Sequence, residues 1–159
     1  MARYRFRMRI EEPVRQLILA GSATVVATRD DELRPSVARG WGVGVSEGGE
    51  RLTLCVGAPP GSAMRANLES TGEIAITCSR PTTYRTVQVK GRVESTGSPS
   101  ADQLAAVEAQ VAAFSAEAVQ LGLPPNAGSL LLDEELLAVT VVPREVYDQT
   151  PGPSAGEKL

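Results

Sequence analysis

The stretch YRTVQVKGRVE, from Tyr84 to Glu94, decides the expected fold of this chain. Three valines and a glycine alternate with polar residues, and this period of two is typical of a β-strand. Arg85 opens the valine face, where a charge costs free energy unless it is paired. Gln88 and Lys90 occupy the middle of the polar face. That polar face therefore either meets solvent or holds a ligand.

The length of the chain is typical of a single domain with a substantial hydrophobic core. The chain has 159 residues and a formal net charge of −3, so a general nucleic-acid or anionic-membrane surface is not expected. No apolar run reaches the roughly 18 residues that span a bilayer. The apolar patch near the N-terminus is interrupted by charged residues and Pro13, which argues against a signal peptide. We therefore expect a cytoplasmic protein.

The chain contains no histidine, and this absence excludes more kinds of catalytic and metal site than any other feature of its composition. It excludes a Ser-His-Asp or Cys-His catalytic system, a His-ligated haem and the usual zinc sites, so we expect no metal. Cys55 and Cys78 fall inside strand-like runs and are expected to be buried free thiols. The chemistry must then come from other side chains or from a cofactor.

The order of predicted elements indicates a closed antiparallel barrel with helices over its openings. Strands are expected at residues 22–31, 33–47, 51–58, 73–81, 82–97 and 135–149, and helices at 11–20, 64–71 and 98–123. Ser62 is the expected cap of the second helix, and Ser98 or Ser100 that of the third. The fold class is therefore mainly β, with one domain over residues 1–150. Residues 151–159 form a Pro/Gly-rich tail, and composition alone predicts disorder from Thr150 onward.

The chain resembles the split-barrel flavin-binding family, the pyridoxamine 5′-phosphate oxidase-like proteins, over roughly residues 13–148. The resemblance rests on TRDDELRPSVARGWGV (28–43), SAMRANLESTGEIAI (62–76) and YRTVQVKGRVE (84–94). The last of these matches the family's fifth strand, Arg-x-Val-x-Val-x-Gly-x-Val-Glu. The resemblance implies a six-stranded antiparallel split β-barrel that is homodimeric. It also implies that FMN, or a deazaflavin coenzyme in a related branch, binds in a groove between the two subunits.

Carried onto this sequence, the resemblance implies cofactor contacts from three segments. Met64 stands where many relatives carry the lysine of the phosphate loop, and an arginine follows one residue later. The true pyridoxamine phosphate oxidase also ends in a Trp- and Arg-Leu-His-containing segment, which this chain lacks, so that reaction is not expected. The FMN phosphate is expected between Ser62, Arg85 and either Arg39 or Arg65. The implied contacts are Val37, Ala38, Arg39, Gly40 and Trp41 on the second strand, Ser62 and Arg65 at the phosphate loop, and Arg85, Gln88 and Lys90 on the fifth strand.

Each candidate also has a purely structural interpretation. Because strand faces alternate, Arg85 and Gln88 cannot both point into one groove unless the strand bulges. A bare glycine face indicates barrel curvature as readily as a close ligand. The structural alternatives are a salt bridge for Arg85, solvent exposure for Gln88 and Lys90, barrel curvature at Gly40, Gly42 and Gly44, a core or interface position for Trp41, a helix cap for Ser62, and no ligand role for Tyr84.

The preferred hypothesis is a homodimeric FMN-binding oxidoreductase that acts on a small-molecule substrate. The cofactor would carry the hydride chemistry, so no side chain need be a strong acid or base. Two alternatives stay open: a deazaflavin-dependent reductase of the same fold, and a ligand-binding split-barrel protein without tight cofactor binding. For the tail, the resemblance favours packing of residues 147–153 on the partner subunit near the groove, with only the last few residues free.

Overall fold

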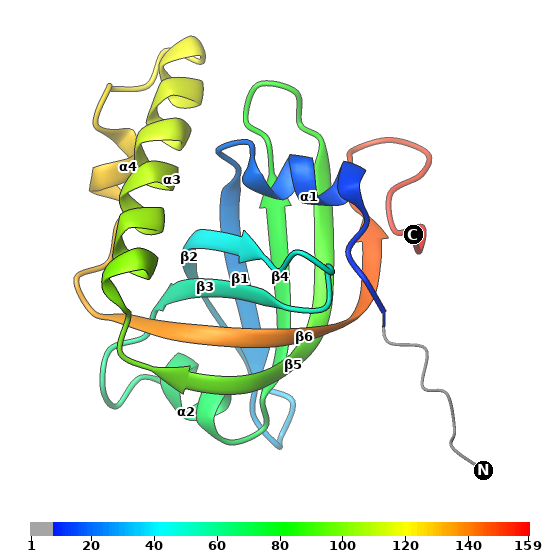
Figure 1. The fold of residues 1–159 in the computed structure, drawn as a ribbon, viewed down its shortest axis with the longest axis vertical. Helices are drawn as coiled ribbons and strands as arrows, with labels where there is room; N and C mark the ends of the chain where they lie inside the picture. The colour runs from blue at the N-terminus through cyan, green and yellow to red at the C-terminus, as the bar shows by residue number, and fades with distance from the viewer. Residues whose placement is uncertain (1–7) are drawn as a thin grey trace.

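Six strands and four helices make up the computed structural model, which describes residues 8–159 (Figure 1). Every neighbouring pair of strands is antiparallel, and the order β1–β2–β3–β6–β5–β4 closes on itself. The prediction of a mainly β, six-stranded antiparallel barrel is confirmed. The elements are α1 (Glu12–Leu19), β1 (Ala23–Arg29), β2 (Pro35–Val45), β3 (Leu52–Gly57), α2 (Ala63–Glu69), β4 (Glu73–Ser79), β5 (Thr86–Gly97), α3 (Ala101–Gln120), α4 (Ala127–Leu130) and β6 (Leu136–Asp148).

One face of each strand fills the barrel interior. On β5, Val87 and Val89 are buried in the main core, whereas Gln88 and Lys90 lie on the outer face. Helix α1 lies at one opening of the barrel and α2 at the other (Figure 1). The alternation that predicted β5 therefore also separates core from surface. The helices that close the openings add Ile18, Met64 and Leu68 to the same core.

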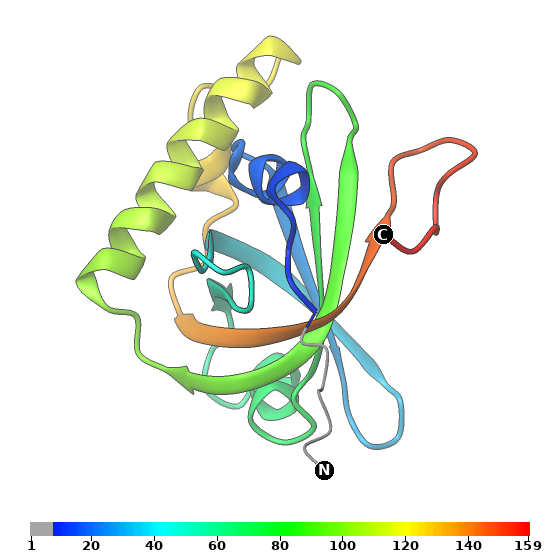
Figure 2. The same cartoon turned by 45° about the vertical axis from the view of Figure 1, so that its right-hand side comes forward.

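Helix α3 packs against the outside of the barrel rather than over an opening (Figure 2). Ser100 and Gln103 form a capping box at its start, so Ser100 is the cap among the two serines, Ser98 and Ser100, that the sequence offered. Trp41 and Phe114 meet edge to face, with ring centroids 5.9 Å apart and ring planes at 83°. A second apolar cluster thus joins α3 to the outer faces of β2 and β3.

The outer face of β1, β4 and β5 lies away from α3 and α4 (Figure 2). In the middle of β1 and β4 its side chains are small, and Val25, Ala27, Ala75 and Thr77 are half-buried. Val37 at the neighbouring end of β2 is 64% exposed. Small side chains beside an exposed valine mark a candidate surface for a ligand or a second subunit.

The last ten residues fold back onto the end of β6. The amide of Asp148 donates to the carbonyl of Glu157, and the amide of Leu159 donates to the carbonyl of Val146, each over 2.9 Å. These bonds pair the outer edge of a strand that would otherwise present free backbone groups. The disorder predicted from composition is therefore wrong, and so is the expectation that the last residues are free.

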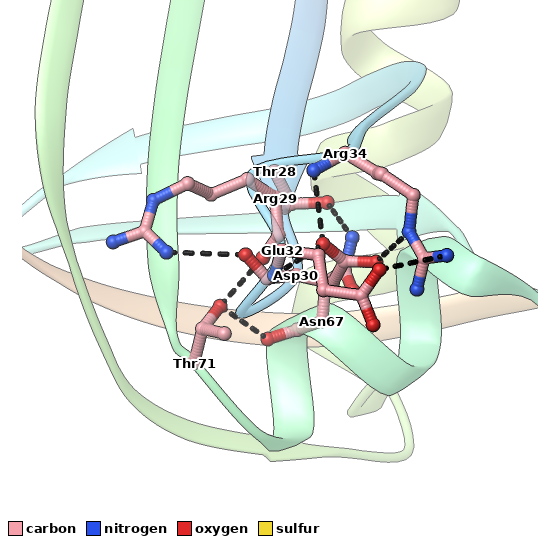
Figure 3. A network of polar contacts seen from close by, with 7 residues as sticks. All are labelled: Thr28, Arg29, Asp30, Glu32, Arg34, Asn67 and Thr71. Carbon is pink, nitrogen blue, oxygen red and sulfur yellow. Dashed lines mark hydrogen bonds and ion pairs between the residues drawn. The ribbon is translucent and has the colours of Figure 1, made fainter.

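A polar network ties α2 to the turn between β1 and β2 (Figure 3). The Asn67 amide donates to the hydroxyl of Thr28 over 3.2 Å, and the Thr71 hydroxyl donates to the carbonyl of Arg29 over 2.8 Å. Asp30 orders the turn itself, because its carboxylate accepts from the Arg34 side chain, which lowers the pKa of Asp30. The network fixes the end of β1 and hence the position of Arg29.

The glycine of the β5 motif lies where two backbones come very close. The ladder between β5 and β6 shifts register between Lys90 and Gly91. A Cβ atom at position 91 would lie 2.5 Å from the carbonyl oxygen of Val142 and 2.8 Å from Cγ1 of Val141. Only a residue without a side chain fits this position without moving β6.

Both cysteines are free and buried, as predicted. Burial raises the pKa of Cys78 to about 11, so its thiol stays protonated at neutral pH. Within residues 8–159, no cluster of three or more metal-binding side chains is found. The same part of the chain contains no helix that is both long and apolar enough to span a membrane.

Candidate ligand-binding face of the barrel

A row of side chains crosses the outer face of five strands in register. Arg39 on β2 is opposite Val25 on β1, which is opposite Thr77 on β4. Thr77 is in turn opposite Gln88 on β5, which is opposite Tyr147 on β6. Residues separated by more than a hundred positions in sequence, such as Val25 and Tyr147, thus lie in one row that follows the curved surface of the barrel.

The next row supplies a floor of small side chains. Ala27 and Ala75 are opposite each other on β1 and β4, and Lys90 follows on β5. A cavity of about 280 Å³ lies over these three residues, with Arg29 and Glu73 at its rim. Two methyl groups, two cations and the Glu73 carboxylate therefore border a shallow site on the sheet.

The charged end of this face is ordered by short contacts. The Lys90 ammonium lies 5.0 Å from the centre of the Tyr147 ring, and the Tyr147 hydroxyl donates to Glu145 over 2.9 Å. Glu145 also accepts from Lys158 over 2.9 Å, and this bond, followed by that from Tyr147, lowers the pKa of Glu145. Its carboxylate in turn raises the pKa of Tyr147. At neutral pH the site therefore carries a neutral phenol beside a cation.

Gln88 keeps acceptor capacity for a ligand. Its side-chain nitrogen donates to the hydroxyl of Thr77 over 3.0 Å, which fixes the amide on the outer face. The amide oxygen has two lone pairs that this bond does not use. The Gln88 amide oxygen could therefore accept a hydrogen bond from an N–H group of a flat ligand that lies on the alanine floor, the surface made by Ala27 and Ala75.

Three of the residues predicted for the cofactor, Arg39, Gln88 and Lys90, lie together on the outer face, as the register above shows. Two others do not present a side chain there. A Cβ atom on Gly40 would lie 2.9 Å from the Val26 side chain, so this glycine faces the barrel interior. Trp41 is 2% exposed beneath α3. The contacts expected from Gly40 and Trp41 are thus corrected to core positions, the alternative that the sequence left open for the tryptophan.

The junction between the loop and α2 carries Ser62 as the helix cap and Arg65 in the first turn of the helix, where the sequence suggested a phosphate site, although their groups are partly used. The hydroxyl of Ser62 accepts from the backbone amide of Arg65 over 3.2 Å, so this serine is the helix cap. Nε of Arg65 donates to the carbonyl of Ala58 over 2.9 Å, which holds the guanidinium over the loop. Met64, at the position of the family's lysine, points into the core and is 3% exposed. Arg65 is therefore the cation of this loop.

Arg85 stands at the other end of the barrel. It precedes Thr86, which pairs with Ser79 at the last position of β4. Ser62 and Arg65 precede the first position of β4, and a seven-residue strand spans about 20 Å. Figure 1 shows the two loops at opposite ends of the barrel. Within one chain, Arg85 and Ser62 cannot hold the same phosphate, and the expectation that they would is corrected.

Several residues of this face were not predicted from the sequence. Ala27, Ala75 and Thr77 lie on β1 and β4, whose alternation of small outer and large inner residues was the available signal. Tyr147 comes next to Gln88 only through the pairing of β5 with β6. Register between distant strands, rather than any local motif, assembles the site.

Comparison with known proteins gives matches at the level of structure. The sequence matches no protein-family model and no curated protein. HupZ of Group A Streptococcus has a TM-score of 0.54 at 16% identity, over 92% of this chain and 99% of that protein. An F420 reductase has a TM-score of 0.52 at 18% identity, over 86% of this chain and 98% of that protein.

A third similar structure is a Lactobacillus delbrueckii protein named as a pyridoxamine 5′-phosphate oxidase. Its TM-score is 0.53 at 14% identity, over 92% of this chain and 99% of that protein. At these identities the likeness concerns the fold. The split-barrel fold implied by the sequence resemblance is thereby confirmed.

Proposed function

We propose that this split-barrel protein is a cytoplasmic, homodimeric oxidoreductase that holds FMN on the outer face of β1, β4 and β5. One observation carries the proposal: a flat floor of small side chains is bordered by a fixed amide and an ammonium group. Ala27 and Ala75 allow a planar ring to approach the sheet closely. Gln88 and Lys90 stand at one edge of that floor.

The protein's own groups would bind and orient the ring. The Gln88 oxygen accepts a hydrogen bond from a ring N–H, and the Lys90 ammonium stabilises negative charge that develops on a reduced ring. The bound flavin supplies the hydride chemistry. No catalytic acid or base is required of the chain, which fits its lack of histidine.

The phosphate would lie at the opposite side of the face. β2 and β5 are three strand spacings apart, or about 14 Å measured along the curved sheet, so a ligand that reaches from Gln88 to Arg39 must be extended and follow the barrel surface. Gly40 pairs with Val56 near the end of β3, so the loop that carries Arg65 begins beside Arg39. These two guanidinium groups are the proposed phosphate contacts, because a guanidinium can hold a phosphate with two parallel hydrogen bonds.

A second copy of the chain would complete the site. The small side chains in the middle of this face are half-buried in the single chain, and a ring on them would keep one side in water. Dimerisation across this face covers that side, with a total interface on the order of 2,000 Å². Residues 147–153 would then lie near the partner, as the resemblance implies.

FMN titration with dimer measurement tests the proposal. We expect the purified protein to quench FMN fluorescence with saturation at one FMN per chain, and small-angle scattering to give a dimer at micromolar concentration. Arg39→Met should weaken FMN about tenfold or more and riboflavin little, because only FMN has the phosphate. A monomer that binds no FMN would contradict the proposal, and equal weakening of both ligands would remove Arg39 from the phosphate.

The deazaflavin coenzyme is the second candidate. Met64 stands where many relatives carry the lysine that meets an FMN phosphate, and the Met64 side chain is buried in the core. An F420 reductase shares the fold. A thermal-shift comparison with FMN, FAD and the deazaflavin separates the candidates, because a ligand that binds only the folded state raises its melting temperature. A protein stabilised by none of the three would be a ligand-binding protein of another kind.

Removing the tail should destabilise the barrel. A chain ending at Asp148 loses the bond from the Gln149 amide to the carbonyl of Thr86, the contact of the Thr86 amide with Thr150, and the edge pairing with β6. Each lost hydrogen bond lowers the free energy of unfolding by about 1 kcal/mol, and the regained chain entropy partly offsets this loss. The net decrease in the free energy of unfolding is about 2 kcal/mol. We expect the melting temperature to fall by about 4–8 °C. An unchanged melting temperature would show that the tail contributes nothing to the fold.

A further inference from the structure

A second cavity opens at the end of the barrel beneath α1. It has a volume of about 290 Å³ and lies between α1, the start of β5 and the folded tail. At about 30 Å³ for each water-sized group, it accommodates a ligand of about ten non-hydrogen atoms. Its apolar lining comes from Pro13, Val14, Leu17 and Val87, and its polar lining comes from Glu11, Arg85, Thr86, Asp148 and Thr150, with Leu159 at one side.

Opposite charges face this cavity without forming an ion pair. Arg85 lowers the pKa of Asp148 through its charge, as the weakest of several causes, the largest being the hydrogen bond from the Thr150 amide. Within residues 8–159, no hydrogen bond or ion pair engages the Arg85 guanidinium. Asp148 accepts from Thr150 over 2.8 Å and from Ser154 over 3.2 Å, and a carboxylate offers about four acceptor positions. Both charges therefore have free capacity toward the cavity.

The loop that presents Arg85 is built to hold it in place. The amide of Arg80 donates to the carbonyl of Arg85 over 2.9 Å and closes the loop. Tyr84 has a φ of 58°, a conformation that non-glycine residues adopt at a cost of about 1 kcal/mol or more. Glu117 on α3 anchors the loop through Arg80, over 3.0 Å, and through the hydroxyl of Thr82. Backbone strain that the surroundings maintain is typical of ligand sites.

We infer that this cavity binds a small zwitterion with an apolar body, namely a free α-amino acid with a branched aliphatic side chain. The ligand's carboxylate meets the Arg85 guanidinium, and its ammonium meets Asp148, with Glu11 as a second carboxylate at the entrance. The side chain lies against Val14 and Leu17. Such a ligand bridges the two charges that the protein itself leaves apart.

This site is separate from the proposed flavin face. Val87 points into the barrel and lines the cavity, whereas Gln88 points to the outer face. The inference therefore stands whether or not the chain binds a flavin. Arg85, which the sequence assigned to the flavin phosphate, belongs on this reasoning to the second ligand.

Isothermal titration calorimetry with L-leucine tests the inference. Wild-type protein should bind leucine more tightly than 4-methylpentanoate, which lacks the ammonium group, and 3-methylbutylamine, which lacks the carboxylate. Arg85→Met should weaken leucine and 4-methylpentanoate by about tenfold or more but leave the amine unchanged. Arg92→Met is the matched control, because Arg92 lies on β5, the strand that Arg85 directly precedes, and pairs with Glu73 on the outer face.

Leu17→Trp tests the volume of the cavity independently. It should remove leucine binding while the protein still melts cooperatively. Saturating FMN should leave leucine binding unchanged, since the sites are separate. Absence of leucine binding at about 10 mM, equal leucine affinity of Arg85→Met and wild type, or competition between leucine and FMN would each overturn the inference.

Discussion

Gly91→Ala should lower the free energy of unfolding by about 3 kcal/mol, the upper part of the range for an overpacked site. The new methyl group would lie 2.5 Å from the carbonyl oxygen of Val142, a backbone atom that cannot move without shifting β6. The register shift at this point leaves no alternative position for the methyl group. For a domain of this length the melting temperature should fall by about 6–12 °C in a calorimetric scan.

Gly97→Ala is the matched control for that change. Gly97 ends the same strand, and a Cβ atom there meets nothing within 4 Å. We expect its melting temperature to stay near that of the wild type or to rise slightly, because alanine restricts the unfolded chain. If both variants melt alike, the close approach of β5 and β6 does not explain the glycine of the motif.

Ala75→Trp should reduce FMN affinity at least about a hundredfold. The indole would occupy the cavity of about 280 Å³ over Ala27 and Lys90, where the ring is proposed to lie. Ala75 points outward and is half-buried, so the barrel interior does not change. The measurement is FMN fluorescence quenching, together with a melting curve and scattering to follow fold and dimer.

Ala112→Trp serves as the control for the indole itself. Ala112 is exposed on α3, on the other side of the barrel from the alanine floor. This variant should bind FMN as the wild type does. An Ala75→Trp protein that retains full FMN affinity would show that the ring does not lie on this face, whatever happens to the dimer.

Local pattern was sufficient to predict the barrel. The alternation in β5 identified both its core face and its surface face, and the capping serine identified the start of α3. The four-residue helix α4 was not predicted, because so short a helix shows no periodicity. The placement of α3 beside the barrel, rather than over an opening, depended on the contact between Trp41 and Phe114 that no local pattern contains.

The candidate site was predictable only in part. Gln88 and Lys90 followed from the motif because strand alternation determines their side of the sheet. Alternation also placed Arg85 on the valine face, and in the structure it lies with Val87 at the barrel opening, away from the loop that carries Ser62. The alanine floor is assembled by register across strands, which a single sequence does not encode locally.

The tail shows how composition can mislead. Its prolines and glycines are typical of disordered segments. Yet Thr150 accepts from the Thr86 amide over 3.0 Å, and Lys158 reaches Glu145 over 2.9 Å. Proline restricts the unfolded chain and lowers the entropy lost when such a segment docks.

The position of β6 between β3 and β5 constrains how the protein can be synthesised. These two neighbours come earlier in the chain, so every strand but β6 leaves the ribosome before the barrel can close. Until then, β3 and β5 each expose an unpaired edge that can pair with another nascent chain. Closure also joins segments far apart in sequence, which is slow compared with helix formation. The interval between translation of β5 and release of β6 is thus the period in which aggregation competes with folding, and chaperone demand should be highest there.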